Sequence, residues 1–343
     1  MKVSIGTKIQ DGPWGGGNLF AKNLSNFLLK NEHEVRFDLK DEDLDIIILT
    51  EPRKTSPSSS FTNYDVLDYL KYKNNSAIVV HRINECDEHK DTSYINKYIA
   101  YANKVSDATI FVSTWIKELY INMGEVNEKP NSVILAGADS ALFNNKNYKL
   151  WNKSEKIRFA THHWSDNWNK GFEVYKLFDK LLSSKKFGNL IDFNFIGRLP
   201  EGLELNNSII TQPLSGQQLA DQIKKSHMYI TGSLNEPSGN HHIEAGQCGL
   251  PVLYINSGGV KEYCEGYGME YNIDNFEEIL LSSINNYDEL IKKASLYPRN
   301  SDKMSLEYVE FFTHLLKNKK TIIENRKKQK PTPIKDLYNK FKK

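Results

Sequence analysis

The sequence of 343 residues has few of the features that mark membrane-spanning, secreted or disulfide-bonded proteins. No stretch approaches the roughly 18 to 20 consecutive apolar residues that a membrane-spanning helix needs, and the start, MKVSIGTKIQDG, lacks a signal-peptide core. The three cysteines (Cys86, Cys248 and Cys264) are an odd number without C-x-x-C spacing. This favours reduced thiols over a disulfide or zinc framework, so we expect a cytoplasmic protein.

The low hydrophobicity of disordered chains is also absent. Hydrophobic residues make up 39% of the sequence and aromatic residues 11%, which is enough apolar surface to form a globular core. Because single hydrophobic cores stop growing near roughly 250 to 300 residues, the length predicts two domains.

The formal net charge of +2 conceals an uneven distribution along the chain. Residues 317–343 contain eleven Lys or Arg and two acidic residues, a charge of +9, so the preceding 316 residues carry −7. Such a basic segment can bind an anionic surface, or it can be a solvated helix end followed by a disordered tail. Both readings stay open; as the anionic partner we expect the inner face of a membrane and not nucleic acid.

Short β-branched runs alternate with amphipathic stretches, which predicts an α/β fold of parallel sheets with helices on both faces. The first half gives predicted strands at residues 2–6, 34–38, 44–49, 77–81, 108–112 and 132–135. After a polar stretch, the second half gives strands at residues 157–161, 192–196, 208–211, 228–231 and 251–254. Ligands of such sheets bind outside the carboxyl ends of the strands, so we expect a cleft between the two halves.

The most informative segment is NEPSGNHHIEAGQCGLPVL at residues 235–253. It follows a predicted strand, turns at Gly239 and enters a helix whose first amides can donate to an anion or to sugar hydroxyls. Glu236 in the loop and Glu244 in the helix can each accept charge-assisted hydrogen bonds from vicinal hydroxyls. Acidic residues at a helix start are also favoured by the helix dipole without any ligand, so the spacing alone leaves both readings open.

This segment, together with the S-G-G-V-x-E-Y that follows it, resembles the E-x7-E region of retaining, nucleotide-sugar-dependent glycosyltransferases of family 4 (group 1). Other segments resemble the family in the same order along the chain: Gly15-Gly16-Gly17-Asn18, Phe111 to Trp115, Ala136 to Phe143, Lys170-Gly171 and Phe195 to Gly197. The resemblance spans roughly residues 1 to 270. It is carried mainly by the E-x7-E segment.

The resemblance implies the GT-B fold, in which two Rossmann-like, doubly wound domains face each other and a helical extension follows. The expected domains are 1–145 on the acceptor side and 146–300 for the nucleotide sugar. We expect a helix at 301–318 that packs back on the first domain, and a basic tail at 319–343. Acceptor specificity would lie in the loops at 50–63 and 84–92.

On the donor side, the resemblance implies that Glu244 binds the ribose hydroxyls of the nucleotide and that Glu236 holds the hydroxyls of the sugar. Lys170 would neutralise the diphosphate; its alternative is a surface lysine at a helix start. Backbone amides would assist Lys170 at Gly239, Asn240 and His241.

From the first domain, Gly16 and Gly17 would close over the phosphates or the acceptor. His81, at the end of the fourth predicted strand, would lie near the sugar in a catalytic role; its alternative is packing at the strand end.

One departure from the family pattern concerns the diphosphate. The family has a Gly-Arg pair shortly before its Lys-Gly, but this chain reads Thr161-His-His-Trp-Ser-Asp-Asn-Trp-Asn-Lys170. His162, His163 or Arg198 could replace the missing arginine, and Arg198 is the predicted phosphate ligand.

No cofactor and no metal site are predicted. The only D-x-D, Asp43-Leu-Asp45, leads into a hydrophobic strand, and the adjacent histidine pairs lack the i, i+4 spacing of helical zinc ligands. Residues 15–20 do not form G-x-G-x-x-G, which disfavours a nicotinamide-dependent dehydrogenase.

The resulting hypothesis is a retaining, metal-independent hexosyltransferase. Its partners would be a nucleotide-sugar donor and a glycan or lipid-linked glycan acceptor in surface glycan biosynthesis, such as lipopolysaccharide or capsule. The alternatives are a sugar-nucleotide epimerase or hydrolase of the same fold, and a catalytically silent protein that binds a nucleotide sugar.

Overall fold

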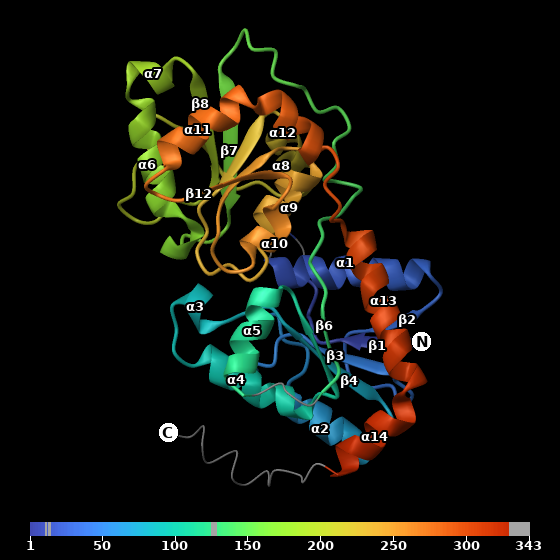
Figure 1. The fold of residues 1–343 in the computed structure, drawn as a ribbon. Coiled ribbons are helices and arrows are strands. Elements are labelled where there is room, and N and C mark those ends of the chain that lie inside the picture. The colour runs from blue at the N-terminus through green and yellow to red at the C-terminus, as the bar shows by residue number, and fades with distance from the viewer. Residues whose placement is uncertain (11, 13–14, 125–128, 329–343) are drawn as a thin grey trace.

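The computed structural model describes residues 1–10, 12, 15–124 and 129–328. Two α/β domains stack on each other, and the chain crosses between them twice (Figure 1). Each domain is built on a six-stranded parallel sheet. The predicted fold class, two doubly wound domains of the GT-B type, is therefore confirmed.

The first domain has the strand order β2-β1-β3-β4-β5-β6. Its strands are β1 Lys2–Ile5, β2 Glu34–Arg36, β3 Ile46–Leu49, β4 Ile78–Ile83, β5 Ala108–Phe111 and β6 Asn131–Val133. Its helices are α1 Gly16–Lys30, α2 Asn63–Tyr72, α3 Asp87–Lys90, α4 Ile95–Ala102 and α5 Thr114–Asn122, with a 3-10 turn η1 at Asn103–Val105. The central strands are buried on both faces because α1 covers one side and α2 the other, which explains their continuous apolar runs.

The second domain has the order β12-β11-β10-β7-β8-β9, the strand order of a dinucleotide-binding sheet. Its strands are β7 Ile157–His163, β8 Ile191–Gly197, β9 Ile209–Thr211, β10 Met228–Thr231, β11 Val252–Ile255 and β12 Gly268–Tyr271. Its helices are α6 Phe172–Leu182, α7 Lys185–Gly188, α8 Gly216–Ile223, α9 Asn240–Gln247, α10 Val260–Cys264, α11 Phe276–Asn285 and α12 Tyr287–Ala294, and a 3-10 turn η2 covers Trp168–Lys170. The switch between β7 and β10 places the loops after these two strands side by side.

The two crossings between the domains touch each other. A side chain on Gly137 would place its Cβ 2.1 Å from the backbone of Asn300, and the amide of Ser301 donates to the carbonyl of Ala138 at 2.8 Å. Only glycine allows this approach.

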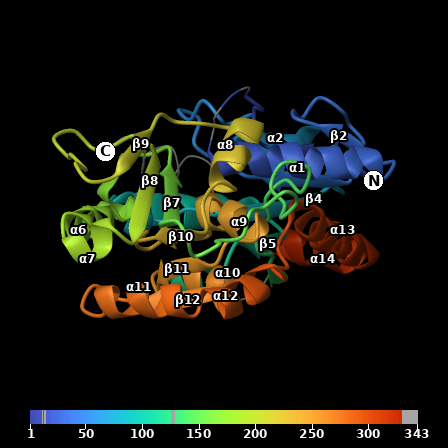
Figure 2. The ribbon, with the colours of Figure 1, turned by 90° about the horizontal axis from the view of Figure 1, so that it is seen from above.

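Helix α13 (Ser301–Lys317) returns to the first domain and lies beside α1 in Figures 1 and 2. The rings of Phe20 and Tyr308 meet there at 5.1 Å. The chain continues as α14 (Lys319–Lys328), whose Arg326 binds the carboxylate of Asp107. Residues 319–328 were expected to belong to the basic tail; they form a helix anchored on the first domain instead, and 329–343 lie outside the described residues.

Candidate functional site

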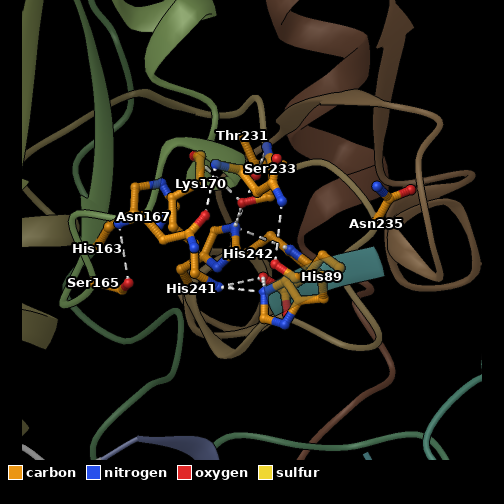
Figure 3. A network of polar contacts seen from close by, with 12 residues as sticks. His89, His163, Ser165, Asn167, Lys170, Thr231, Ser233, Asn235, His241 and His242 are labelled. Carbon is orange, nitrogen blue, oxygen red and sulfur yellow. Dashed lines mark hydrogen bonds and ion pairs between the residues drawn. The ribbon is translucent and has the colours of Figure 1, made fainter. Parts of the chain in front are cut away.

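The carboxyl ends of the second sheet face the first domain, where α1, α3 and α5 lie (Figure 1). The loops after β7 and β10 gather polar side chains at this edge, and α3 of the first domain reaches the same place. Figure 3 shows this cluster from close by.

Two helix N-termini meet across the gap between the domains. Helix α9 begins after Gly239 and α1 begins after Gly15, and neither has a side chain that caps its free amides. A Cβ on Gly16 would lie 3.0 Å from the Oδ1 of Asn240, so the two helix starts are in close approach. Free amides and two positive dipole ends make this gap favourable for an anion.

Gly239 cannot be replaced without displacing the site. Its φ is +70°, in the left-handed region that side chains disfavour. A Cβ there would lie 2.4 Å from the ring of His242 and 2.9 Å from the Cγ of Glu236. The glycine therefore allows the turn that brings Glu236 next to the start of α9.

The backbone of Glu236 is held by the loop that carries the S-G-G motif. The amide of Gly259 donates to the carbonyl of Glu236 at 2.8 Å, and the amide of Asn235 donates to the hydroxyl of Ser257 at 2.8 Å. A Cβ on Gly258 would lie 2.5 Å from backbone atoms of Glu236. The two motifs thus form one unit that fixes the carboxylate.

Lys170 and Glu236 form an ion pair in the cluster. The Nζ of Lys170 lies 2.6 Å from the Oε2 of Glu236, and the side chains are only 16% and 6% exposed. Burial alone would raise the pKa of Glu236, but Lys170 and His89 hold it well below its usual range. Glu236 is therefore ionised at neutral pH.

His89 was not among the predicted site residues, yet it is the residue through which the first domain enters this cluster. Its Nε2 lies 2.9 Å from the Nζ of Lys170 and 3.3 Å from the Oε2 of Glu236, and its Nδ1 lies 3.0 Å from Glu85. Burial lowers its pKa, but Glu236 and Glu85 outweigh this effect and raise it overall. The one signal in the sequence is the E-x-x-x-H spacing of Glu85 and His89 within the segment assigned to the acceptor.

Glu244, predicted to bind the ribose, is buried on α9 and bonded to a histidine. The Nε2 of His162 lies 2.8 Å from its carboxylate, and the Nδ1 of His162 lies 3.0 Å from the hydroxyl of Tyr229. Because a carboxylate only accepts, the Nε2 of His162 donates to Glu244, and Nδ1 can accept from the hydroxyl of Tyr229. His162 therefore orients Glu244 and is not placed as a substitute for the missing arginine.

His163 is also unsuited to that role. Its Nε2 lies 2.6 Å from the hydroxyl of Tyr175, and burial lowers its pKa well below the usual value. His241 behaves alike: its Nε2 lies 2.7 Å from the Oγ1 of Thr231, and burial lowers its pKa. Both rings are neutral structural groups, so a contribution of His241 to ligand binding rests on its backbone amide.

The other predicted residues lie apart from the cluster. His81, expected near the sugar, is buried within the first sheet with its Nδ1 3.1 Å from the Oδ1 of Asn103, and burial lowers its pKa to about 4. His81 thus packs inside β4, and its catalytic role stays a prediction; the histidine that reaches the cluster is His89. Arg198 is exposed, with its guanidinium 5.8 Å from the centre of the Trp164 ring, and stays a prediction as a phosphate ligand.

The D-x-D carboxylates pair with the start of β1. The Nζ of Lys2 lies 2.8 Å from Asp43, and the amide of Lys2 donates to Asp45 at 2.8 Å. Within the described part of the chain, no group of three or more His, Cys, Asp or Glu side chains is arranged to hold a metal ion.

Comparisons with known proteins find a glycosyltransferase family and structures of the same two-domain fold. Residues 193–294 match the family described as glycosyl transferases group 1. The structure of Anabaena HepE in complex with UDP and glucose superposes with a TM-score of 0.67 at 15% identity, covering 92% of this chain and all of HepE. Sucrose-phosphate synthase from Thermosynechococcus elongatus gives a TM-score of 0.62 at 12% identity over 92% of this chain and 99% of its own.

A third similar structure is the pneumococcal O-GlcNAc transferase GtfA in complex with UDP and GlcNAc, with a TM-score of 0.58 at 15% identity over 81% of this chain and 59% of its own. None of the curated proteins matches this chain significantly in sequence. The family match covers the loop and helix that carry Glu236, Gly239 and Glu244. The chain is therefore a glycosyltransferase of the GT-B fold, and residues 193–294 of its second domain match the group 1 glycosyl transferases.

Proposed function

We propose that this protein transfers a hexosyl group from a nucleotide sugar to a hydroxyl of a glycan or lipid-linked glycan, with retention of the anomeric configuration. The observation that carries the proposal is the Lys170–Glu236 pair, set beside two uncapped helix N-termini at the gap between the domains. The arrangement offers positive charge and free amides for a diphosphate, next to a carboxylate for sugar hydroxyls.

The chemistry follows from the charges that develop during transfer. The anomeric C–O bond breaks with oxocarbenium character, and the nucleoside diphosphate leaves with the bonding electrons. Lys170 and the first amides of α9 would stabilise the leaving oxygen, while Glu236 orients the sugar. Glu244, held by His162, would fix the ribose and so place the diphosphate.

Retention is supported by the group 1 family of residues 193–294, and we propose departure and attack on the same face of the sugar. Metal independence is supported by Lys170 and the helix amides, which supply positive charge at the leaving group without a cation. The D-x-D carboxylates are engaged with Lys2.

For the donor we propose a UDP-hexose as the first candidate. Anabaena HepE has been solved in complex with UDP-glucose, and an alpha-glucosyltransferase of similar fold was solved with UDP-glucose and DNA. These ligands belong to those proteins; here they define the probes.

The direct test is incubation of the full-length protein with labelled UDP-, GDP- and ADP-hexoses and a panel of glycoside acceptors. Transfer to an acceptor, with the product anomer read by NMR in the presence and absence of a chelator, supports the proposal. Free nucleotide with isomerised or hydrolysed sugar and no transfer would favour the epimerase or hydrolase, and no binding of any nucleotide would refute the proposal.

We further propose that the acceptor is part of a surface glycan and that residues 317–343 bring the enzyme to the inner face of the membrane. Among the described residues, no helix has the length and apolar character to cross a bilayer. The support is the +9 charge of that segment, since a basic residue near an anionic surface contributes about 1 kcal/mol.

This association is tested by truncating the chain after Lys328, because α13 and α14 pack on the first domain and must be kept. The cut removes a net charge of +4 out of the +9, so we expect the truncated protein to bind vesicles of phosphatidylglycerol and phosphatidylcholine more weakly than the full chain at low salt but to keep part of the binding. Equal binding by both would argue against the anchor.

A further inference from the structure

The diphosphate of a bound donor needs positive charge that this chain does not supply at the usual place. The stretch before Lys170 has no arginine. Its two histidines are engaged with Glu244 and Tyr175, and Arg198 lies over Trp164. The group nearest to Lys170 besides Glu236 is His89, which comes from the other domain.

The position of His89 is fixed from both sides. The amide side chain of Asn169 donates to the carbonyl of His89 at 3.2 Å, and the amide side chain of Asn235 donates to the carbonyl of Glu88 at 3.2 Å. The hydroxyl of Tyr120 donates to the carbonyl of Glu85 at 3.1 Å. The ring is only 8% exposed, so it is a built part of the cluster and not a surface histidine.

The contacts define the protonation state of the free enzyme. The Nε2 of His89 lies 2.9 Å from the ammonium of Lys170, which only donates, and 3.3 Å from Glu236, which only accepts. We infer that it accepts from the nearer ammonium and carries no proton while this contact lasts. The proton of the ring is then on Nδ1, which donates to Glu85 at 3.0 Å. A carboxylate behind the ring is the arrangement that stabilises a second proton as soon as Nε2 is released.

We propose that His89 supplies the second positive charge at the diphosphate, by taking up a proton at Nε2 when the nucleotide draws Lys170 away from it. The inference rests on the proposed function, since it requires a nucleoside diphosphate to bind at Lys170. The proton comes from water, and the imidazolium lies between Glu85 and the ligand. Before Lys170 moves, an oxygen bound to its ammonium lies at most about 6 Å from Nε2, which is the 2.9 Å contact plus one hydrogen-bond length.

The other ionisable groups around His89 favour this change. On its own segment stand Glu85 and Lys90, whose Nζ lies 3.2 Å from Glu85, and Arg53 acts on Glu85 from the neighbouring loop. From the second domain come Lys170 and Glu236, with His242 beside them as a neutral ring, since burial lowers its pKa to about 4. His89 is therefore the histidine of this cluster that is backed by carboxylates, so the proton uptake is assigned to it.

The test is isothermal titration of the full-length protein with UDP, and with GDP and ADP in parallel, in two buffers of different ionisation enthalpy. At about pH 8 the terminal phosphate is already ionised, since its second pKa is near 6, so protons taken up belong to the protein. We expect uptake of up to one proton per nucleotide, and affinity that rises as the pH falls from about 8 to about 6.5.

Variants identify the group. His89→Gln should abolish the uptake and weaken diphosphate binding about 10- to 100-fold, the range of one charge-assisted hydrogen bond, while binding of the bare nucleoside changes less than about twofold. His314→Gln, an exposed histidine on α13, is the matched control and should keep the uptake. Glu85→Gln should reduce it because the imidazolium loses its counter-charge.

Binding of a nucleoside diphosphate by the wild-type protein without proton uptake overturns this inference and leaves the proposed function standing. Uptake that persists in His89→Gln also overturns it. No binding of any nucleoside diphosphate refutes the proposed function itself.

Discussion

Removing Lys170 should expose how much the protein depends on pairing the charge of Glu236. The Glu236 side chain is 6% exposed and that of Lys170 is 16% exposed. Lys170→Met therefore leaves a buried carboxylate whose remaining ion-pair partner is His89, at 3.3 Å. Breaking a buried pair by removing one partner costs about 3 to 5 kcal/mol. We expect the variant to lose stability in the lower half of that range, because His89 takes over part of the interaction.

The double variant Lys170→Met with Glu236→Gln tests whether the unpaired charge of Glu236 causes the loss of stability. Without the carboxylate no buried charge remains, so the double variant should be more stable than Lys170→Met alone. For a domain of 150 to 250 residues each kcal/mol changes Tm by roughly 2 to 4 °C, so the single variant should melt roughly 6 to 16 °C below the wild type.

The pH dependence gives an independent check with a definite sign. In the wild type the pKa of Glu236 is depressed, so its stabilisation is present at neutral pH and is lost on acidification through the folded-state pKa. In Lys170→Met the buried carboxyl should have a raised pKa, so that variant should gain stability relative to the wild type between about pH 7 and about pH 5. Urea denaturation followed by circular dichroism measures both. A single variant no less stable than the double variant would refute the reasoning.

Three further changes test other parts of the site. Glu244→Ala should weaken UDP binding by roughly 1.5 to 3 kcal/mol per lost charge-assisted hydrogen bond, while pyrophosphate binding, which needs no ribose, stays unchanged; calorimetry that finds equal UDP affinity would contradict its assignment. Gly239→Ala should abolish transfer because its Cβ would meet His242 at 2.4 Å, whereas Gly202→Ala, with similar φ and no neighbour within 4 Å, should stay active in the same assay. Glu262→Gln should lower Tm slightly, since its carboxylate accepts from the amides of Thr114 and Trp115 across the domains at 2.8 and 3.0 Å and such a charge at a helix N-terminus contributes about 0.3 to 1 kcal/mol. We also expect Glu262→Gln to have a more open shape in small-angle X-ray scattering, because these hydrogen bonds join the two domains. An unchanged shape would argue against this role of Glu262.

The central strands of the sheets were predictable because they are short, apolar and buried on both faces, and the sequence pattern located eleven of the twelve strands in the described residues. The strand that was missed, β12 (Gly268–Tyr271), is an edge strand with only Tyr271 buried, so it lacks the apolar run. No helix was predicted over α2, whose start is fixed by the capping box of Thr62 and Asp65. The basic segment at 319–328 was predicted to be part of the tail because the residue that anchors it, Asp107, lies more than two hundred residues from Arg326 in the sequence.

The candidate site also contains both residues that are close in sequence and residues that only the fold brings together. Glu236, Gly239 and Glu244 lie on one loop and helix, where spacing along the chain fixes spacing in space, so a sequence pattern can locate them. The residue of the first domain that lies opposite Lys170 is determined by the packing of the two domains. A local sequence pattern therefore could not predict the contact between Lys170 and His89. The arginine that the family pattern places before Lys170 is missing, and in the structure His89 of the first domain lies 2.9 Å from Lys170. His89 comes from the first domain and Lys170 from the second, so with the proposed role of His89 the stabilisation of the leaving group would depend on how the two domains meet, whereas an arginine on the same domain as Lys170 would act independently of the first domain.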